Sequence, residues 1–70
     1  MTKQEWQTKK IVFNANTRSI IEIERRNERE YRVVIAGKVV NRTKLYRLAL
    51  SKARRIAEMD SEAFAKVVSA

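Results

Sequence analysis

The segment NRTKLYRLALSKARRIAEM, residues 41–59, carries the clearest periodicity of this sequence. At 3.6 residues per turn its apolar side chains fall on one broad side of a helix and its bases gather on the other. The segment therefore predicts an amphipathic helix of about five turns, with Asn41 or Thr43 as its N-cap. The apolar side of this helix is expected to pack against a sheet. The residues expected on that side are Leu45, Leu48, Ala49, Ala53, Ile56, Ala57 and Met59.

Three short runs before this segment are rich in β-branched and aromatic residues and are bounded by turn-forming residues. They are residues 10–15 (KIVFNA), 19–25 (SIIEIER) and 30–36 (EYRVVIA). Three-residue loops at 16–18 and 26–28 would place the alternating apolar residues of all three on one face of an antiparallel meander. The predicted pairs are Phe13 with Ile21, Ile11 with Ile23, Ile23 with Tyr31, and Ile21 with Val33.

The opposite face of the predicted sheet mixes charged and apolar side chains. An ordinary solvated face with scattered valines explains this mixture. A dimer surface and a seat for Trp6 are the alternatives. The residues expected on this face are Val12, Asn14, Ile20, Glu22, Glu24, Arg32 and Val34.

The two ends of the chain complete the predicted architecture. Residues 1–9 form a polar N-terminal arm in which Trp6 is either a packing anchor or an aromatic that faces a partner. Asp60 or Ser61 caps a short terminal helix that has Phe64, Val67 and Val68 on one side. The prediction is an α+β fold of order β-β-β-α-α: a three-stranded antiparallel meander packed against one long helix, in a single domain over residues 10–70.

The composition argues against catalysis. The 70 residues include no histidine and no cysteine, so the commonest general base, the thiolate metal ligands and disulfides are all missing. A single glycine excludes a glycine-rich phosphate loop. We expect no enzyme activity, no metal and no cofactor. No apolar run has the length of a membrane span or of a signal peptide core, so we expect no membrane partner and a cytoplasmic location.

The charge points to a polyanion. Sixteen bases against eight acids leave +8, and no acid lies between residues 38 and 55. Arg42 and Lys44 fall in the first turn of the predicted helix, where bases oppose the helix dipole. Free backbone N–H groups at a helix N-terminus bind phosphate, and we expect Arg42, Thr43 and Lys44 to complete a phosphate clamp there that removes the penalty. The predicted contact residues are Arg42, Thr43, Lys44, Arg47, Ser51, Arg54, Arg55 and Lys38, with Arg26 and Arg29 of the second hairpin as secondary candidates. A merely solvated basic helix is the alternative.

Three antiparallel strands followed by a long helix is an element order similar to that of several small DNA-binding modules, including the arm-type domains of phage integrases. In those modules the exposed sheet face enters the groove, whereas Glu22 and Glu24 occupy that face here, so the resemblance assigns no residues. The first hypothesis is a small nucleic-acid-binding protein, with DNA favoured over RNA and with a monomer or homodimer as the active form. The second is a regulatory or inhibitory protein that binds an acidic surface of a larger protein.

Overall fold

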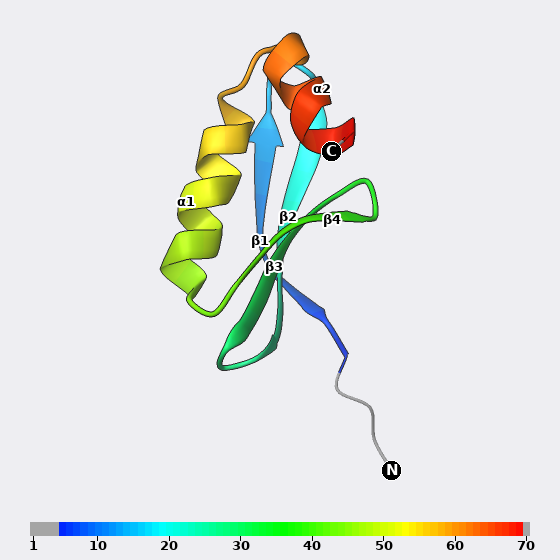
Figure 1. The fold of residues 1–70 in the computed structure, drawn as a ribbon. Helices are drawn as coiled ribbons and strands as arrows, with labels where there is room; N and C mark the ends of the chain where they lie inside the picture. The colour runs from blue at the N-terminus through cyan, green and yellow to red at the C-terminus, as the bar shows by residue number, and fades with distance from the viewer. Residues whose placement is uncertain (1–4, 70) are drawn as a thin grey trace.

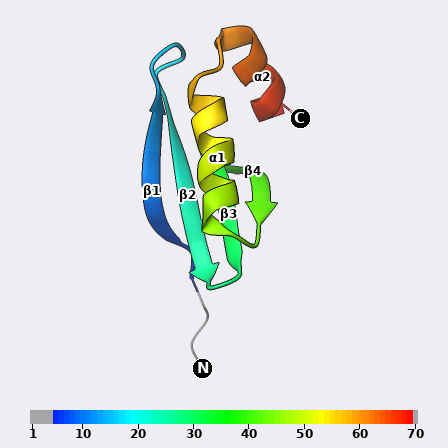
Figure 2. The same cartoon turned by 90° about the vertical axis from the view of Figure 1, so that its left-hand side faces the viewer.

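Residues 5–69, which the computed structural model describes, form four antiparallel strands and two helices. The elements are β1 (Gln7–Asn14), β2 (Ser19–Asn27), β3 (Glu30–Ile35), β4 (Lys38–Thr43), α1 (Tyr46–Ala57) and α2 (Ser61–Ser69). The strands are hydrogen-bonded in chain order, and α1 lies across one face of the sheet (Figures 1 and 2). The α+β class is confirmed, but the prediction of three strands is wrong.

The fourth strand follows a two-residue turn. Ala36 and Gly37 have φ angles of 50° and 79°. Left-handed backbone at both central residues is the geometry of a type I′ turn, which suits the twist of a hairpin. The chain therefore reverses between Ile35 and Lys38 and pairs with β3, with Val40 as an extra, unpaired residue.

The long helix is consequently shorter than predicted. It begins at Tyr46, and its N-cap residue is Leu45, whose side chain makes no capping hydrogen bond. Arg42 and Thr43 lie in β4, so the prediction that Arg42 occupies the first turn is wrong, as is the prediction that Asn41 or Thr43 caps the helix.

The hydrophobic core lies between α1 and the sheet. Ala49 and Ala53 are one turn apart on the buried side of α1, and their small side chains let the helix backbone come close to the strands. Leu45 and Leu48, predicted to be buried, are instead 46% and 51% exposed. The buried core side chains are Ile21, Ile23, Val33, Ile35, Ala49, Ala53 and Ile56.

The register of β1 is offset by one residue from the prediction. Asn14 pairs with Ser19, so the turn spans residues 15–18, and Val12 rather than Phe13 lies opposite Ile21. Because a one-residue slip exchanges the two faces of a strand, Val12 packs against the core whereas Ile11 and Phe13 face away from it, 58% and 55% exposed. The predicted pairs of β1 with β2 are wrong, as is the predicted face of Val12 and Asn14.

Buried Asn14 explains this register. Its Nδ2 donates to the carbonyl oxygens of Ile56 at 2.7 Å and Met59 at 3.0 Å. Its Oδ1 accepts from the backbone N–H groups of Asn16 at 2.8 Å and Thr17 at 3.0 Å. A side-chain amide has two donors and two acceptor positions, so every one is used. Asn14 thereby joins the β1–β2 turn to the end of α1.

The register between β2 and β3 differs from the prediction by two residues. Ile23 lies opposite Val33 and Ile21 opposite Ile35, because the turn is tighter than predicted and Arg26 is an extra residue in β2. A shift of two residues leaves each side chain on its original face. The predicted pairs are therefore wrong, but the predicted buried face of these two strands is confirmed.

The short terminal helix is confirmed. Asp60 Oδ1 accepts a hydrogen bond from the N–H of Ala63 at 2.8 Å, which is the contact of an N-cap. Phe64, Val67 and Val68 pack against the core. The Lys38 ammonium group donates to the Val68 carbonyl, which places α2 at the end of the sheet where β3 turns into β4 (Figure 1).

The first strand begins within the predicted arm and contains a bulge. Gln7 is its first residue, Thr8 lies opposite Glu24, and Lys10 lies opposite Ile23. Lys9 is therefore an extra residue that interrupts the ladder between β1 and β2. Residues 1–4 of the predicted arm lie outside the described residues.

Candidate nucleic-acid interface

The outer side of α1 brings four of the predicted contact residues together. Arg47, Ser51, Arg54 and Arg55 are all exposed. Their spacing of i, i+4, i+7 and i+8 puts them along one stripe of a helix, opposite the buried alanines. Lys44, also exposed, lies just before the helix begins. These five residues are called the helix stripe below.

The structure places the other three predicted residues elsewhere. Arg42 is the cross-strand partner of Arg32 in β3, so it shares the sheet face of Arg32, which is turned away from α1. Thr43 is half-buried and lies opposite Tyr31. Lys38 stands at the far end of β4, against α2. The predicted phosphate clamp of Arg42, Thr43 and Lys44 around a helix N-terminus is therefore not formed.

The arginines of the helix stripe have no ion-pair partner within residues 5–69. The ion pair found in that part of the chain joins Arg32 and Glu24. The first turn of α1 contains no acid, so Arg47 opposes the helix dipole without compensation. Arg54 and Arg55 lie in the last turn, where positive charge favours the helix. Helix stability thus accounts for part of the stripe but not for Arg47.

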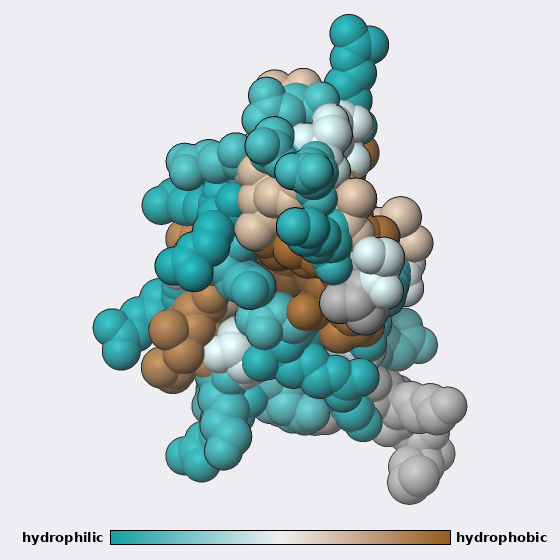
Figure 3. Space-filling view, turned by 45° about the horizontal axis from the view of Figure 1, so that its top comes forward, coloured by the Kyte–Doolittle hydropathy of each residue, from teal (hydrophilic) through white to brown (hydrophobic). Residues whose placement is uncertain are grey.

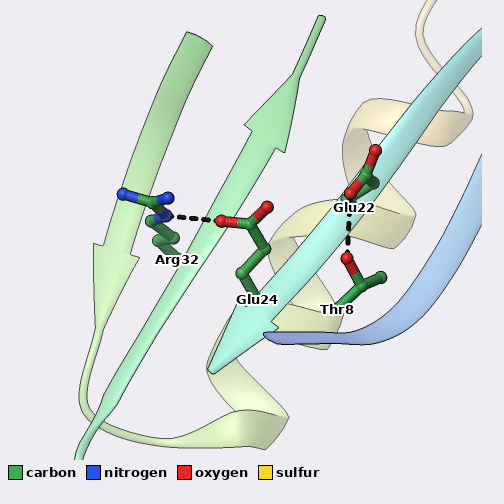
Figure 4. Close-up of polar contacts among 4 residues, drawn as sticks. All are labelled: Thr8, Glu22, Glu24 and Arg32. Atoms are coloured by element: carbon green, nitrogen blue, oxygen red, sulfur yellow. Dashed lines mark hydrogen bonds and ion pairs between the residues drawn. The ribbon is translucent and has the colours of Figure 1, made fainter. Parts of the chain in front are cut away.

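The acids on the outer sheet face are engaged by neighbours on the same face. Figure 4 shows this face with α1 behind the strands. Arg32 Nε donates to Glu24 Oε1 at 2.6 Å, and Thr8 Oγ1 donates to Glu22 Oε1 at 3.1 Å (Figure 4). The two glutamates therefore contribute local order here, and they leave Arg42 without a carboxylate partner within residues 5–69.

An apolar patch lies on this outer sheet face, at the end next to the turn between β1 and β2. Phe13 is the cross-strand partner of Ile20, and Ile11 is two residues along β1 from Phe13. Ile20 is 53% exposed, whereas Val34 on the same face is only 6% exposed. The sequence analysis missed Ile11 and Phe13 because it assigned them to the core. In Figure 3 exposed apolar surface appears as separate patches between hydrophilic side chains.

Trp6 lies at the opposite end of the sheet from α2 and is half-buried. The guanidinium carbon of Arg32 stands 4.1 Å from the centre of the Trp6 ring, which is a cation–π contact.

A cavity of about 270 Å³ lies beside Trp6. Its lining includes Trp6, Arg29, Tyr31, Arg42 and Lys44. The sequence analysis named Arg29, Arg42 and Lys44 separately, and no sequence signal joined them to the tryptophan. Arg26, the other secondary candidate, is exposed but does not line this cavity.

Other kinds of site find no support in residues 5–69. That part of the chain holds no cluster of acidic side chains able to bind a metal ion, and none of its helices is both long and apolar enough to cross a membrane. Comparison of the chain with protein-family models, with curated proteins and with solved structures found no match.

Proposed function

We propose that this protein binds nucleic acid, with duplex DNA preferred, through phosphate contacts made by the helix stripe. The observation that carries the proposal is the exposure of Lys44, Arg47, Arg54 and Arg55 with no acidic partner for any of them within residues 5–69. Arginine and lysine side chains that project freely from a helix are the groups that neutralise backbone phosphates. No enzyme activity is part of the proposal.

The shape of α1 favours DNA over RNA. The helix lies on the outside of the sheet (Figures 1 and 2), and its 12 residues span about 18 Å. The major groove of B-form DNA admits an α-helix, whereas the major groove of A-form RNA is too narrow for side chains to read. Arg47 and Arg54 are separated by about 10 Å along the helix, so they can contact phosphates of different nucleotides.

Fluorescence anisotropy with labelled duplex DNA, measured across a salt series, tests the proposal. Four phosphate contacts predict a slope of about −3.6 for log K against log salt, a loss of about 150-fold in affinity between 50 and 200 mM salt. A variant with Lys44, Arg47, Arg54 and Arg55 changed to alanine is expected to lose most of this slope.

The matched control changes the same number of bases away from α1, in Lys9, Lys10, Arg18 and Lys66, all of which are exposed. Net charge falls equally in both variants, so a general effect of charge would weaken both to the same extent. Equal weakening, or no duplex binding by the unchanged protein at low salt, would refute the proposal.

A protein partner is the second candidate, and the exposed patch of Ile11, Phe13 and Ile20 supports it. Such a partner would be acidic, as the net charge of +8 requires, and the patch would supply its apolar anchors. Val34 is too deeply buried to be an anchor. Phe13→Ser leaves the helix stripe intact. If this variant no longer binds the protein partner, the apolar patch makes the contact, and this candidate is distinguished from contact with nucleic acid.

A further inference from the structure

We propose that the cavity beside Trp6 binds one unpaired nucleotide of a nucleic acid, with the base against the Trp6 ring and the phosphate held by Arg29, Arg42 and Lys44. The cavity lies at the end of the sheet where β2 turns into β3 and where β4 leads into α1. This inference extends the proposed function, since Lys44 belongs both to the cavity and to the helix stripe.

The aromatic side chains of the cavity are held in place before any ligand arrives. The Arg32 guanidinium covers one face of the Trp6 ring, so a ligand can contact only the opposite face and the edge of that ring. Tyr31 also lines the cavity, but its ring packs 5.8 Å from that of Tyr46, at an angle of 59°, on the side of the sheet that α1 covers. The stacking surface is therefore Trp6, and a ring that Arg32 already holds loses little conformational freedom when a base stacks on it.

The charged side chains of the cavity favour a phosphate. Arg29, Arg42 and Lys44 are exposed and have no ion-pair partner within residues 5–69. The one acid of the lining, Glu30, accepts a hydrogen bond from the side-chain amide of Asn27, which engages its carboxylate at the β2–β3 turn. Three bases therefore face the cavity against one acid.

The size and composition of the cavity favour a nucleotide over an acidic peptide. About 270 Å³ lies just below the usual range for ligand sites, which is roughly 300–1,000 Å³. A carboxylate side chain would satisfy the bases, but it would offer no flat face to the Trp6 ring. A base joined to a phosphate satisfies both, because every base offers a flat face for stacking.

Trp6 supplies the readout, because the chain contains no other tryptophan. The protein is titrated with a blunt DNA duplex, with the same duplex carrying a two-adenine overhang, and with that duplex carrying an abasic overhang that has the same phosphates but no bases. The adenine overhang is expected to tighten binding by about fivefold or more over the blunt duplex and to quench Trp6 emission. The abasic overhang is expected to give no quenching. Equal affinity and equal emission with the two overhangs would overturn the inference.

Two variants test the residues of the cavity by anisotropy. Arg42→Ala is expected to lose the gain from the adenine overhang and to bind the blunt duplex within twofold of the unchanged protein. Trp6→Phe keeps a ring and is expected to retain most of the gain, whereas Trp6→Leu loses it. Circular dichroism checks that each variant is folded. A folded Trp6→Leu variant with the full gain would contradict the stacking contact.

A short 5′-phosphorylated adenine dinucleotide separates this inference from the proposed function. If Trp6 is quenched by the dinucleotide while no duplex binds, the cavity site stands and the proposed function of the helix stripe fails. If blunt and overhanging duplexes bind alike without quenching, the helix stripe stands and the cavity site fails. If neither ligand binds, both are wrong.

Discussion

Replacing Asn14 is expected to destabilise the fold more than its single polar side chain suggests. In Asn14→Ala the buried carbonyl of Ile56 loses its side-chain donor but keeps the backbone N–H of Met59, so this loss costs about 0.5–1.5 kcal/mol. The three partly buried hydrogen bonds to Met59, Asn16 and Thr17 are worth about 0.5–1.5 kcal/mol each. The total is roughly 2–6 kcal/mol, a large share of the whole stability of about 4–10 kcal/mol for a domain of this size.

The assay is urea unfolding followed by circular dichroism. Asn16→Ala is the control, because it removes one exposed hydrogen bond to the same Met59 carbonyl and is expected to cost less than about 1 kcal/mol. An Asn14→Ala chain that is already unfolded without urea agrees with the estimate. If its free energy of unfolding lay within about 1 kcal/mol of the unchanged protein, the hydrogen bonds of Asn14 to Ile56 and Met59 would not hold the turn to the end of α1.

Asn14→Asp gives the same argument a pH dependence. The introduced carboxylate keeps the two turn contacts but faces the carbonyl oxygens of Ile56 and Met59 without a proton to donate. Burial raises the pKa of such a carboxyl in the folded state above its unfolded value, so the folded state binds the proton more tightly. The stability deficit of this variant relative to the unchanged protein is therefore expected to shrink as the pH falls. A deficit that stays constant with pH would contradict the placement of the side chain.

Three further experiments test other parts of the structure by the same unfolding assay. Leu45→Ser supplies the capping side chain that α1 lacks and is expected to stabilise the protein by about 0.5–1 kcal/mol; a loss of stability would contradict the exposure of Leu45. Phe13→Thr is expected to cost less than about 1 kcal/mol and Ile21→Ala about 2–5 kcal/mol, because Phe13 lies outside the core; the reverse order would restore the predicted register. A double-mutant cycle of Glu24→Gln and Arg32→Ala is expected to give a coupling of about 1 kcal/mol for this partly exposed pair, and a coupling near zero would count against the contact.

The sequence predicted the elements that have a strong local pattern. The alternation in β2 and β3 identified the buried face even though the turn between them was wrong, because a shift of two residues preserves the face. The cap at Asp60 and the apolar spacing of Phe64, Val67 and Val68 identified α2. Each of these signals lies within a few residues of the feature that it predicts.

The fourth strand could not be predicted from the same signals. Its turn needs two residues with left-handed backbone. The sequence indicates only Gly37 for such a conformation, because an alanine such as Ala36 rarely adopts a φ of 50°. Without the turn, residues 41–45 continue the helical pattern of α1. The predicted phosphate clamp failed for this reason, because it depended on where the helix begins.

The register of β1 depends on contacts far along the chain. Hydrophobicity favours burial of Ile11 and Phe13, but the structure buries Val12 and Asn14 in their place. The hydrogen bonds that favour this choice join Asn14 to residues 42 and 45 positions away. No local pattern contains them, and the cavity beside Trp6 was missed for the same reason, because its lining comes from three separate segments.

The bulge at Lys9 bears on how this protein behaves at high concentration. β1 is a free edge of the sheet, next to a face that exposes Ile11 and Phe13, and such edges are where chains join into intermolecular sheets. The bulge divides that edge into two short segments. If the β1 edges of two molecules came together antiparallel, Lys9 and Lys10 of each would approach those of the other and repel them. Removing Lys9 is expected to straighten the strand and leave a longer unbroken edge, and therefore to raise the tendency of the protein to form fibres.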